Sequence, residues 1–425
     1  MVRGDALYNQ FIAILREELR PAMGCTEPIA LAMAGAKARQ LLGTLPEKVE
    51  LRVSGNIIKN VKSVVVPNTG GQHGMAAAVC AGIVAGDPEA ELQVISNVDP
   101  SQHQVIWDYI CRVQPQILPA ESGLVFDIDL TVSAGSDTAR LRIVNHHTNI
   151  VLLQKNEEVL LERPVAESSE DALTDKSCLT VARIVEFADC LDVEDIRETV
   201  GFQIEKNMAI AKAGLESSWG ANVGSVILHH QGDSPAKRAA AWAAAGSDAR
   251  MSGCEMPVVI VSGSGNQGIT SSVPVAVYAR EMGASEEKLL KAVALSDLVT
   301  IHQKTGIGRL SAYCGAISAG CGAGAGIAYL QGGDTEAIAH TVVNAIAILS
   351  GTICDGAKPS CAAKIASAVD AGILGYQMYL DGQQFYGGDG IVTKGVDNTV
   401  YNVGRLAREG MRETDRTILE IMMTN

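Results

Sequence analysis

The sequence predicts an α+β protein, in which an N-terminal mixed α/β region, residues 1–165, packs on a mostly α-helical C-terminal region, residues 166–425. Short segments with alternating or β-branched residues follow one another in the first region, which is the pattern of strands. From Ser169 onward, longer apolar runs at helical spacing dominate. Of the 425 residues, 47% are hydrophobic, only 4% are aromatic and 43 are glycine. Because small side chains let helices approach closely, we expect a compact core with tight helix crossings.

The first region begins with two helices. Apolar residues near helical spacing predict a helix over residues 8–19, and it should end at Arg20-Pro21 because a residue before proline leaves the helical region. The segment GCTEP, residues 24–28, follows. Thr26 is expected to cap the helix that Pro28 opens. Cys25 would then lie at a helix N-terminus, where the macrodipole favours a thiolate.

Seven segments with a β pattern make up the rest of this region. They are residues 49–53, 63–66, 92–95, 124–132, 139–144, 149–154 and 158–163. Residues 54–56 are expected to form a loop, and residues 145–148 a hairpin turn between two strands. A polar, glycine-rich loop over residues 67–74 leads into an alanine-rich helix.

The second region is predicted to be almost entirely helical. The helical segments are residues 175–188, 193–215, 235–245, 271–282, 285–299, 324–330, 335–350, 362–374 and 403–423. Gly246 is expected to end the helix that begins at Pro235. Residues 257–261 form a short buried strand or helix start before the loop SGSGNQG, residues 262–268.

Composition excludes several classes of protein. The net charge is −14 and no Lys/Arg block stands out, so we expect neither a nucleic-acid nor a membrane partner. No apolar run reaches the roughly 18 residues of a spanning helix. The N-terminus lacks the apolar core of a signal peptide, so we expect a cytoplasmic protein. A homo-oligomer is compatible with the sequence, which does not fix the oligomeric state.

Clustered cysteines are the strongest indication of a site. Ten cysteines in a chain of this length are too few for a disulfide scaffold, and a cytoplasmic protein would keep them reduced. Cys354 and Cys361 flank a turn between two apolar helical runs, and Cys314 and Cys321 form a second pair in a glycine-rich setting. The C-x-x-C spacing that zinc favours is absent. Thiolates at longer, uneven spacing suit an iron–sulfur cluster.

Two polar loops are candidates for binding a small acid. Backbone N–H groups and polar side chains at a helix start suit a carboxylate. In the loop 262–268 these side chains are Ser262, Ser264, Asn266 and Gln267. In the loop 67–74 they are Asn68, Thr69 and His73. A purely structural turn is the alternative, and neither phosphate-binding fingerprint is present.

Four motifs together resemble a known family. They are GCTEP at 24–28, SGSGNQG at 262–268, the glycine-rich stretch 314–326 and ICDGAKPSC at 353–361. They are similar to those of the L-cysteine desulfidase family, over nearly the whole chain. Its relatives, the iron–sulfur L-serine dehydratases, are resembled mainly in the C-terminal half, which would be the catalytic region.

The resemblance implies a [4Fe–4S] cluster on three cysteines and a fourth cysteine as base. The ligands would be Cys354, Cys361 and Cys314, with Cys321 as the alternative to Cys314, and the base would be Cys25. Glu27 could orient Cys25 or pair with the substrate ammonium, and Lys358 could bind the substrate or hold the cluster loop in shape.

The implied reaction is β-elimination of L-cysteine to pyruvate, ammonia and sulfide. The first alternative is an iron–sulfur hydro-lyase, similar to L-serine dehydratase, acting on serine or a related hydroxy acid. The second is a non-catalytic iron–sulfur redox sensor. In either enzyme the small amino-acid substrate would bind where the two regions meet.

Overall fold

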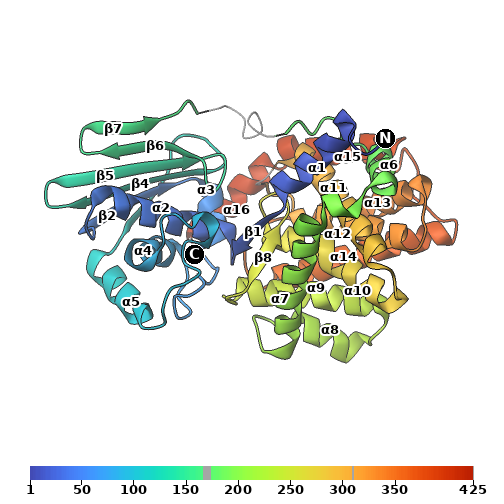
Figure 1. Ribbon diagram of the computed structural model, residues 1–425, viewed down its shortest axis with the longest axis horizontal. Coiled ribbons are helices and arrows are strands. Elements are labelled where there is room, and N and C mark those ends of the chain that lie inside the picture. Colours follow the sequence, from blue (N-terminus) through green and yellow to red (C-terminus); the bar gives the residue numbers. More distant parts are fainter. Residues whose placement is uncertain (166–173, 309–310, 425) are drawn as a thin grey trace.

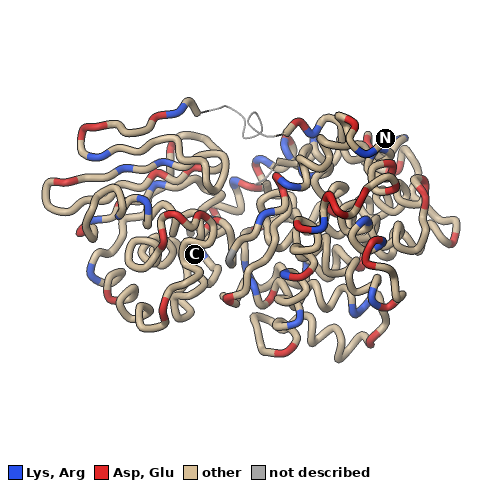
Figure 2. The backbone as a smooth tube through the Cα atoms, in the orientation of Figure 1, with Lys and Arg blue, Asp and Glu red and all other residues tan. Residues whose placement is uncertain are grey.

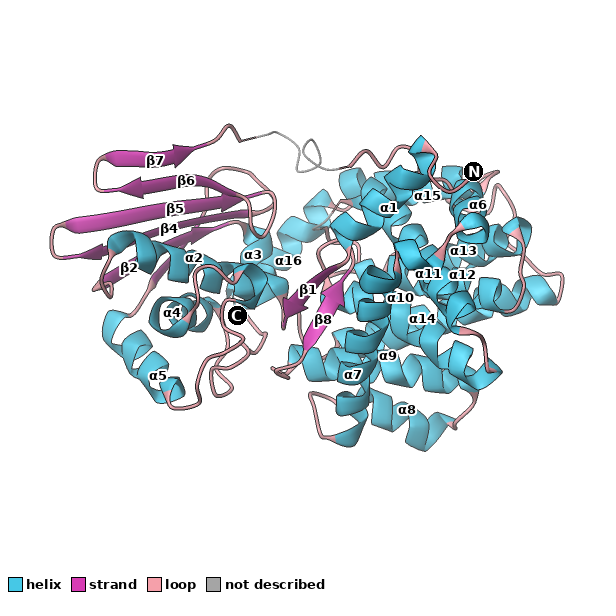
Figure 3. Ribbon diagram, in the orientation of Figure 1, coloured by secondary structure: helices cyan, strands magenta, loops and turns pink. Residues whose placement is uncertain are grey.

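The computed structural model describes residues 1–165, 174–308 and 311–424, which form two lobes (Figure 1). One lobe contains a sheet with helices on it, and the other is nearly all helix (Figure 3). The predicted α+β class is therefore confirmed. No described helix combines the length and apolarity needed to cross a bilayer. Basic and acidic residues are interspersed along the chain in both lobes (Figure 2).

The sheet lobe is built on six strands in the order β3-β2-β4-β5-β6-β7. Their bounds are β2 Lys48–Val53, β3 Gln116–Pro119, β4 Asp127–Ala134, β5 Asp137–Val144, β6 Ile150–Lys155 and β7 Glu158–Glu162. β2 and β3 are parallel, and the other neighbours are antiparallel. The register places Leu51 opposite Leu130 and Leu130 opposite Leu141, so buried leucines form a row on one face of the sheet.

Four helices accompany this sheet, namely α2 Thr26–Leu42, α3 Gly55–Val61, α4 Met75–Ala85 and α5 Gln102–Val113. Helix α2 packs on β4 and β5, and α4 packs on α2. The α2–α4 crossing requires glycine: a Cβ at Gly82 would lie 1.8 Å from the carbonyl oxygen of Ala32. The tight crossings expected from the composition are thus present in this lobe.

The helical lobe contains the remaining α-helices and strands, and the last of these helices, α16, also reaches the sheet lobe. They are α1 Ala6–Glu18, β1 Arg20–Met23, α6 Val181–Cys190, α7 Phe202–Glu216, α8 Val223–Gln231, α9 Pro235–Met251, β8 Pro257–Ile260, α10 Gly265–Met282, α11 Glu286–Ile307, α12 Gly315–Leu330, α13 Thr335–Leu349, α14 Cys361–Leu380, α15 Val396–Arg405 and α16 Arg412–Thr424. Helix α12 packs against α10, α11, α13 and α14 and so lies at the centre. Glycines bring α12 and α14 close, since a Cβ at Gly324 would lie 2.5 Å from the carbonyl oxygen of Gly372.

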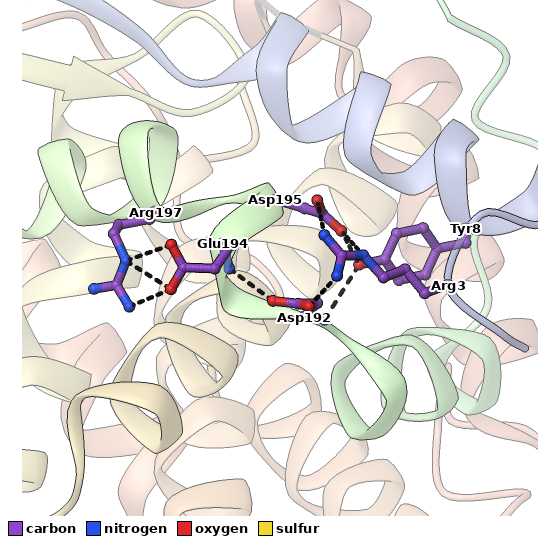
Figure 4. A network of polar contacts seen from close by, with 6 residues as sticks. All are labelled: Arg3, Tyr8, Asp192, Glu194, Asp195 and Arg197. Carbon is purple, nitrogen blue, oxygen red and sulfur yellow. Dashed lines mark hydrogen bonds and ion pairs between the residues drawn. The ribbon is translucent and has the colours of Figure 1, made fainter.

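The two ends of the chain cross between the lobes. Helix α1 contributes to the core of the helical lobe, where the Phe11 and Phe187 rings lie 4.9 Å apart. The Arg3 guanidinium pairs with Asp195, 2.8 Å away, and with Asp192, while the Tyr8 hydroxyl donates to Asp195 (Figure 4). The N-terminal helix, which the sequence assigned to the first region, therefore packs with the second. The predicted boundary near residue 165 adjoins residues 166–173, which lie outside the described residues.

At the other end, α16 returns to the sheet lobe. Its Asp415 forms an ion pair with Lys59 of α3, and its Leu419 packs so closely on Gly55 that a Cβ there would lie 2.5 Å away. Both terminal segments of the chain therefore link the two lobes.

Some predicted elements of the sheet lobe are wrong. Residues 63–66 contribute only a single bridge, from Val65 to His73, instead of a strand. Residues 92–95 lie in a short 3₁₀ helix, Glu91–Gln93, and in the turn after it. Their apolar side chains cover the core from loops, which a short β-branched run does not distinguish from a strand. Residues 54–56 begin α3 and are not a loop.

Two helix boundaries were predicted wrongly because glycines inside helices were interpreted as helix ends or loops. Helix α9 continues through Gly246 to Met251, because Gly246 is needed for packing: a Cβ there would lie 3.3 Å from the Cα of Ala211. Helix α12 begins at Gly315, so the stretch 314–326 is a helix rather than a loop. Helix α5 and strand β3 were not predicted at all.

Candidate active site

A cavity of about 110 Å³ lies between the lobes. The sheet lobe contributes the N-terminus of α2 and the end of α3, and the helical lobe contributes the end of α9 and the starts of α10, α12 and α14. The motifs that the sequence singled out at 24–28, 262–268, 314 and 354–361 all reach this cavity. Segments more than 300 residues apart in the chain therefore form one site.

Cys25 is positioned at the start of α2. Strand β1 pairs with β8 and leads into Gly24, whose φ is +58° and whose Cβ, if present, would lie 2.3 Å from Pro67 Cγ. The N-cap of α2 is Cys25 itself, so the prediction that Thr26 caps the helix is wrong. The Thr26 hydroxyl instead donates to the carbonyl oxygen of Gly263, 3.0 Å away, which ties α2 to the glycine-rich loop.

Cys25 belongs to a buried chain of hydrogen bonds. Its Sγ donates to Glu27 Oε2 at 3.2 Å, and Asn60 Nδ2 donates to Glu27 Oε1 at 3.0 Å. Burial raises the pKa of Cys25 well above its ordinary value, the Glu27 carboxylate adds to the rise, and Arg250 opposes it. The expectation that the helix N-terminus makes Cys25 a thiolate is therefore wrong for the free site. Cys25 is a thiol whose proton points at a carboxylate, and Glu27 is in position to accept it.

Three further cysteines line the cavity. Cys314 is the N-cap of α12, Cys354 lies in the loop after α13, and Cys361 is the first residue of α14. The two loops lie side by side, because the N–H of Cys314 donates to Thr352 O at 3.0 Å and the N–H of Cys354 donates to Ala312 O at 2.6 Å.

Cys321 has a different environment. It lies inside α12, is 1% exposed and is absent from the cavity wall. Of the two cysteines that the sequence left open as the third ligand, the geometry brings Cys314 to the other two.

Three cysteine thiols at one cavity are the donor type that iron–sulfur clusters take. None of the described cysteines forms a disulfide. Burial raises the pKa of Cys314 to about 12, with Cys354 adding to the rise, and burial also raises the pKa of Cys361. Neighbouring thiolates repel one another, so all three cysteines would be ionised together only with cations bound to them. Within the described residues no group of three or more His, Cys, Asp or Glu side chains could hold a metal ion.

The loop before Cys361 is held by its own charges. Asp355 pairs with Lys358 and with Lys364, whose Nζ lies 2.6 Å from Oδ1. Burial acts to raise the pKa of Asp355, but hydrogen bonds from the two lysines outweigh it and the pKa lies below its ordinary value. Lys358 is not part of the cavity wall. Gly356, with φ +95°, allows the loop to approach the carbonyl oxygen of Lys59.

The predicted substrate-binding residues of the two polar loops divide into three groups. Ser264, Asn266 and Gln267 line the cavity at the start of α10. Ser262 lines a neighbouring cleft of about 650 Å³, which shares Gly263 and Ser311 with the cavity.

The residues of the loop 67–74 are elsewhere. Asn68 Nδ2 donates to Ile95 O at 2.8 Å, the Thr69 hydroxyl donates to Val66 O at 2.7 Å, and His73 is exposed. None of the three lines the cavity, so they do not enter the proposal below.

The structure adds two polar residues that the sequence did not indicate, Arg250 and Tyr313, and it leaves one atom of Gln267 unpaired. Arg250, Tyr313 and Gln267 line the cavity, and within the described structure each has a buried polar atom without a hydrogen-bond partner: Nε, the hydroxyl and Oε1 respectively. Buried polar atoms are normally paired, so three unpaired ones around a cavity indicate a polar ligand. Tyr313 directly precedes Cys314 and could have been suspected for that reason. Arg250 ends an alanine-rich helix and carried no signal.

Comparison with known proteins identifies the class. Residues 89–420 match the family model described as serine dehydratase alpha chain. This is a family of dehydratase-like lyases that are typically iron–sulfur dependent. The chain belongs to the serine dehydratase alpha chain family, which confirms the predicted relationship to these enzymes.

Close relatives extend over the full length. A UPF0597 protein of Desulfitobacterium hafniense is 55% identical over 423 residues, covering 100% of this chain and 98% of the relative. A UPF0597 protein of Treponema denticola is 44% identical, covering 98% of both chains. A UPF0597 protein of Lachnoclostridium phytofermentans is 46% identical, covering 98% of this chain and 100% of the relative. These alignments thus span both lobes.

Proposed function

We propose that this protein is an iron–sulfur lyase that catalyses β-elimination of L-cysteine to pyruvate, ammonia and sulfide. The observation that carries the proposal is the convergence of Cys314, Cys354 and Cys361 with the Cys25–Glu27 pair on one buried cavity. Three thiols from the helical lobe and a thiol–carboxylate pair from the sheet lobe provide separate groups for holding a cofactor and for moving a proton. Membership in the serine dehydratase alpha chain family supports the reaction class.

Cys314, Cys354 and Cys361 would hold a [4Fe–4S] cluster. When bound, a cluster with three protein ligands supplies an open iron that acts as a Lewis acid toward the leaving group. The Asp355–Lys358–Lys364 network keeps the loop that carries Cys354 and Cys361 in shape.

The chain's own groups perform the proton transfer. The substrate carboxylate binds at the start of α10, where backbone N–H groups and the helix dipole favour an anion. Glu27 takes the proton of Cys25, and the thiolate then removes the proton from the substrate Cα. The electron pair of that C–H bond forms the Cα–Cβ double bond, and the leaving group departs with the electrons of its bond to Cβ. The aminoacrylate product tautomerises and hydrolyses to pyruvate and ammonia.

L-Serine is the second candidate substrate, and the family match is the observation that favours it. Elimination from serine needs the same base and the same carboxylate site but releases water instead of sulfide. The two substrates are therefore distinguished by their products.

The test is anaerobic reconstitution with iron and sulfide, removal of the excess sulfide, and assay of both substrates. Sulfide and pyruvate released in equal amounts from L-cysteine support the proposal, and pyruvate from L-serine alone supports the second candidate. A cluster with neither activity supports a redox sensor and contradicts both.

Cys314→Ala and Cys321→Ala form a matched pair for the cofactor. Both residues belong to the same helix region and both are buried, but only Cys314 lines the cavity. We expect Cys314→Ala to lose the cluster's absorption and bound iron, and Cys321→Ala to retain both. The reverse result would contradict the ligand assignment.

A further inference from the structure

Arg250 is a buried cation in the wall of the cavity. It lies in the last turn of α9 and is 2% exposed. Its Nη1 donates to Asn266 Oδ1 at 3.1 Å, and its Nε has no partner in the described structure. No ion pair of the described residues includes it, whereas Lys59 pairs with Asp415 and Lys358 with Asp355.

A guanidinium in this position needs an anion. Burying a charge without a partner is strongly unfavourable, so such groups are normally paired. The position over the C-terminal end of α9 offsets part of the cost through the helix dipole, but it leaves Nε without an acceptor. Arg250 is part of the cavity wall, so an anionic ligand in the cavity would lie beside the guanidinium.

The guanidinium lies against the first turn of α10. A Cβ on Gly265 would lie 2.4 Å from Arg250 Nε and 2.7 Å from Cζ, so only glycine allows this approach. The first N–H groups of a helix have no partner inside the helix. The cation and the N-terminus of α10 therefore lie together in the wall of the cavity.

We propose that Arg250 and the first turn of α10 together receive the α-carboxylate of the substrate. The inference rests on the proposed function and assigns the residue that selects its substrate class. A guanidinium binds a carboxylate through two parallel hydrogen bonds, which fixes the carboxylate plane and thereby the direction of the neighbouring Cα–H bond. The site selects amino acids with a free carboxylate and rejects the corresponding amides and amines.

The experiment measures binding as well as turnover. L-Alanine carries the ammonium and carboxylate but no leaving group, and L-alaninamide lacks the carboxylate charge. We expect Arg250→Met to weaken L-alanine binding to the reconstituted protein about 100-fold, the range for a hydrogen-bonded charge, and to leave alaninamide binding unchanged. Arg250→Lys keeps the positive charge but not the paired N–H groups of the guanidinium. It should therefore bind L-alanine more tightly than Arg250→Met but less tightly than the unmodified protein.

Two further variants keep the test decisive. Gly265→Ala displaces the guanidinium without removing it and should also weaken L-alanine selectively. Arg238→Met, on the same helix but paired with Asp233 and Glu281 at the surface, should have no effect. Equal loss of alanine and alaninamide binding in Arg250→Met, or no loss of either, would overturn the proposal.

Failure of the inference is distinguishable from failure of the proposed function. If no substrate is eliminated but Arg250→Met still weakens the binding of L-alanine selectively, the carboxylate site is supported and the proposed reaction is contradicted. If elimination proceeds and Arg250→Met leaves the KM for the amino acid unchanged, the proposed reaction is supported and the assignment of Arg250 is contradicted.

Discussion

The two walls of the cavity differ in how completely their polar groups are paired. On the sheet-lobe wall, Cys25, Glu27 and Asn60 form one chain of hydrogen bonds, and Lys59 is paired with Asp415. On the helical-lobe wall, Arg250, Gln267 and Tyr313 each have a buried polar atom that finds no hydrogen-bond partner among the residues the structure describes. Both walls are buried, so the difference is not one of solvent exposure.

This difference indicates a division of work. A fully paired wall holds its groups in fixed positions before the substrate arrives, which is what proton transfer requires. A wall with unpaired groups is incomplete until a ligand binds, and each unpaired atom costs stability in its absence. The sheet lobe therefore provides the preorganised proton acceptor, and the helical lobe provides the binding surface for cofactor and substrate.

Removing the thiol of Cys25 from the paired wall should have the largest effect on the elimination rate. We expect Cys25→Ala to lower the elimination rate by about 10³-fold, within the usual range for loss of a general base, while cluster absorption and L-alanine affinity remain. Cys80→Ala, a buried cysteine of the same lobe outside the cavity, is the control. Loss of the cluster in Cys25→Ala would make Cys25 a ligand, and an undiminished rate would remove it from the mechanism.

Neutralising the Glu27 carboxylate should make the Cys25 thiol easier to alkylate but lower the rate of elimination. Glu27→Gln removes the negative charge that, after burial, raises the pKa of Cys25, so that pKa should fall. The pH midpoint for alkylation of Cys25, followed by mass spectrometry of its peptide, should move to lower pH. The elimination rate should nevertheless drop about 100-fold, because no carboxylate accepts the thiol proton. A midpoint that stays or moves to higher pH would show that Glu27 does not act on Cys25.

The groups of the paired wall could be predicted because their signals are local. GCTEP places Cys25 and Glu27 two residues apart at a helix start, and the structure joins them by a hydrogen bond. The loop 354–361 is likewise compact in sequence, and its cysteines reach the cavity together. Strands β2 and β4 to β7 were predicted nearly at their bounds, since their alternation reflects burial on one face.

The unpaired wall could not be predicted to the same extent, because its properties arise from tertiary packing. Arg250 reaches the cavity only because Gly265 has no side chain, and the two residues lie on different helices. Asn68 and Thr69 have the same composition of polar and glycine neighbours as Ser264 and Asn266, yet they bind backbone carbonyls. The raised pKa of Cys25 also depends on burial, which a helix-dipole argument does not include.

Replacing Lys358 tests whether the charged groups of the loop 354–361 are already paired or are available to bind the substrate. The sequence offered it as a substrate ligand, but its ammonium pairs with Asp355 and donates to Gly356 O at 3.2 Å. Because Lys364 also holds Asp355, Lys358→Met should cost only about 0.5 kcal/mol of stability, typical of a partly exposed pair. The KM should change less than about twofold, since no contact with substrate is lost. Lys364→Met, which also removes a hydrogen bond to Ile353 O, should cost more in thermal unfolding. A tenfold rise in KM for Lys358→Met would instead place its ammonium on the substrate and count it among the groups that await a ligand.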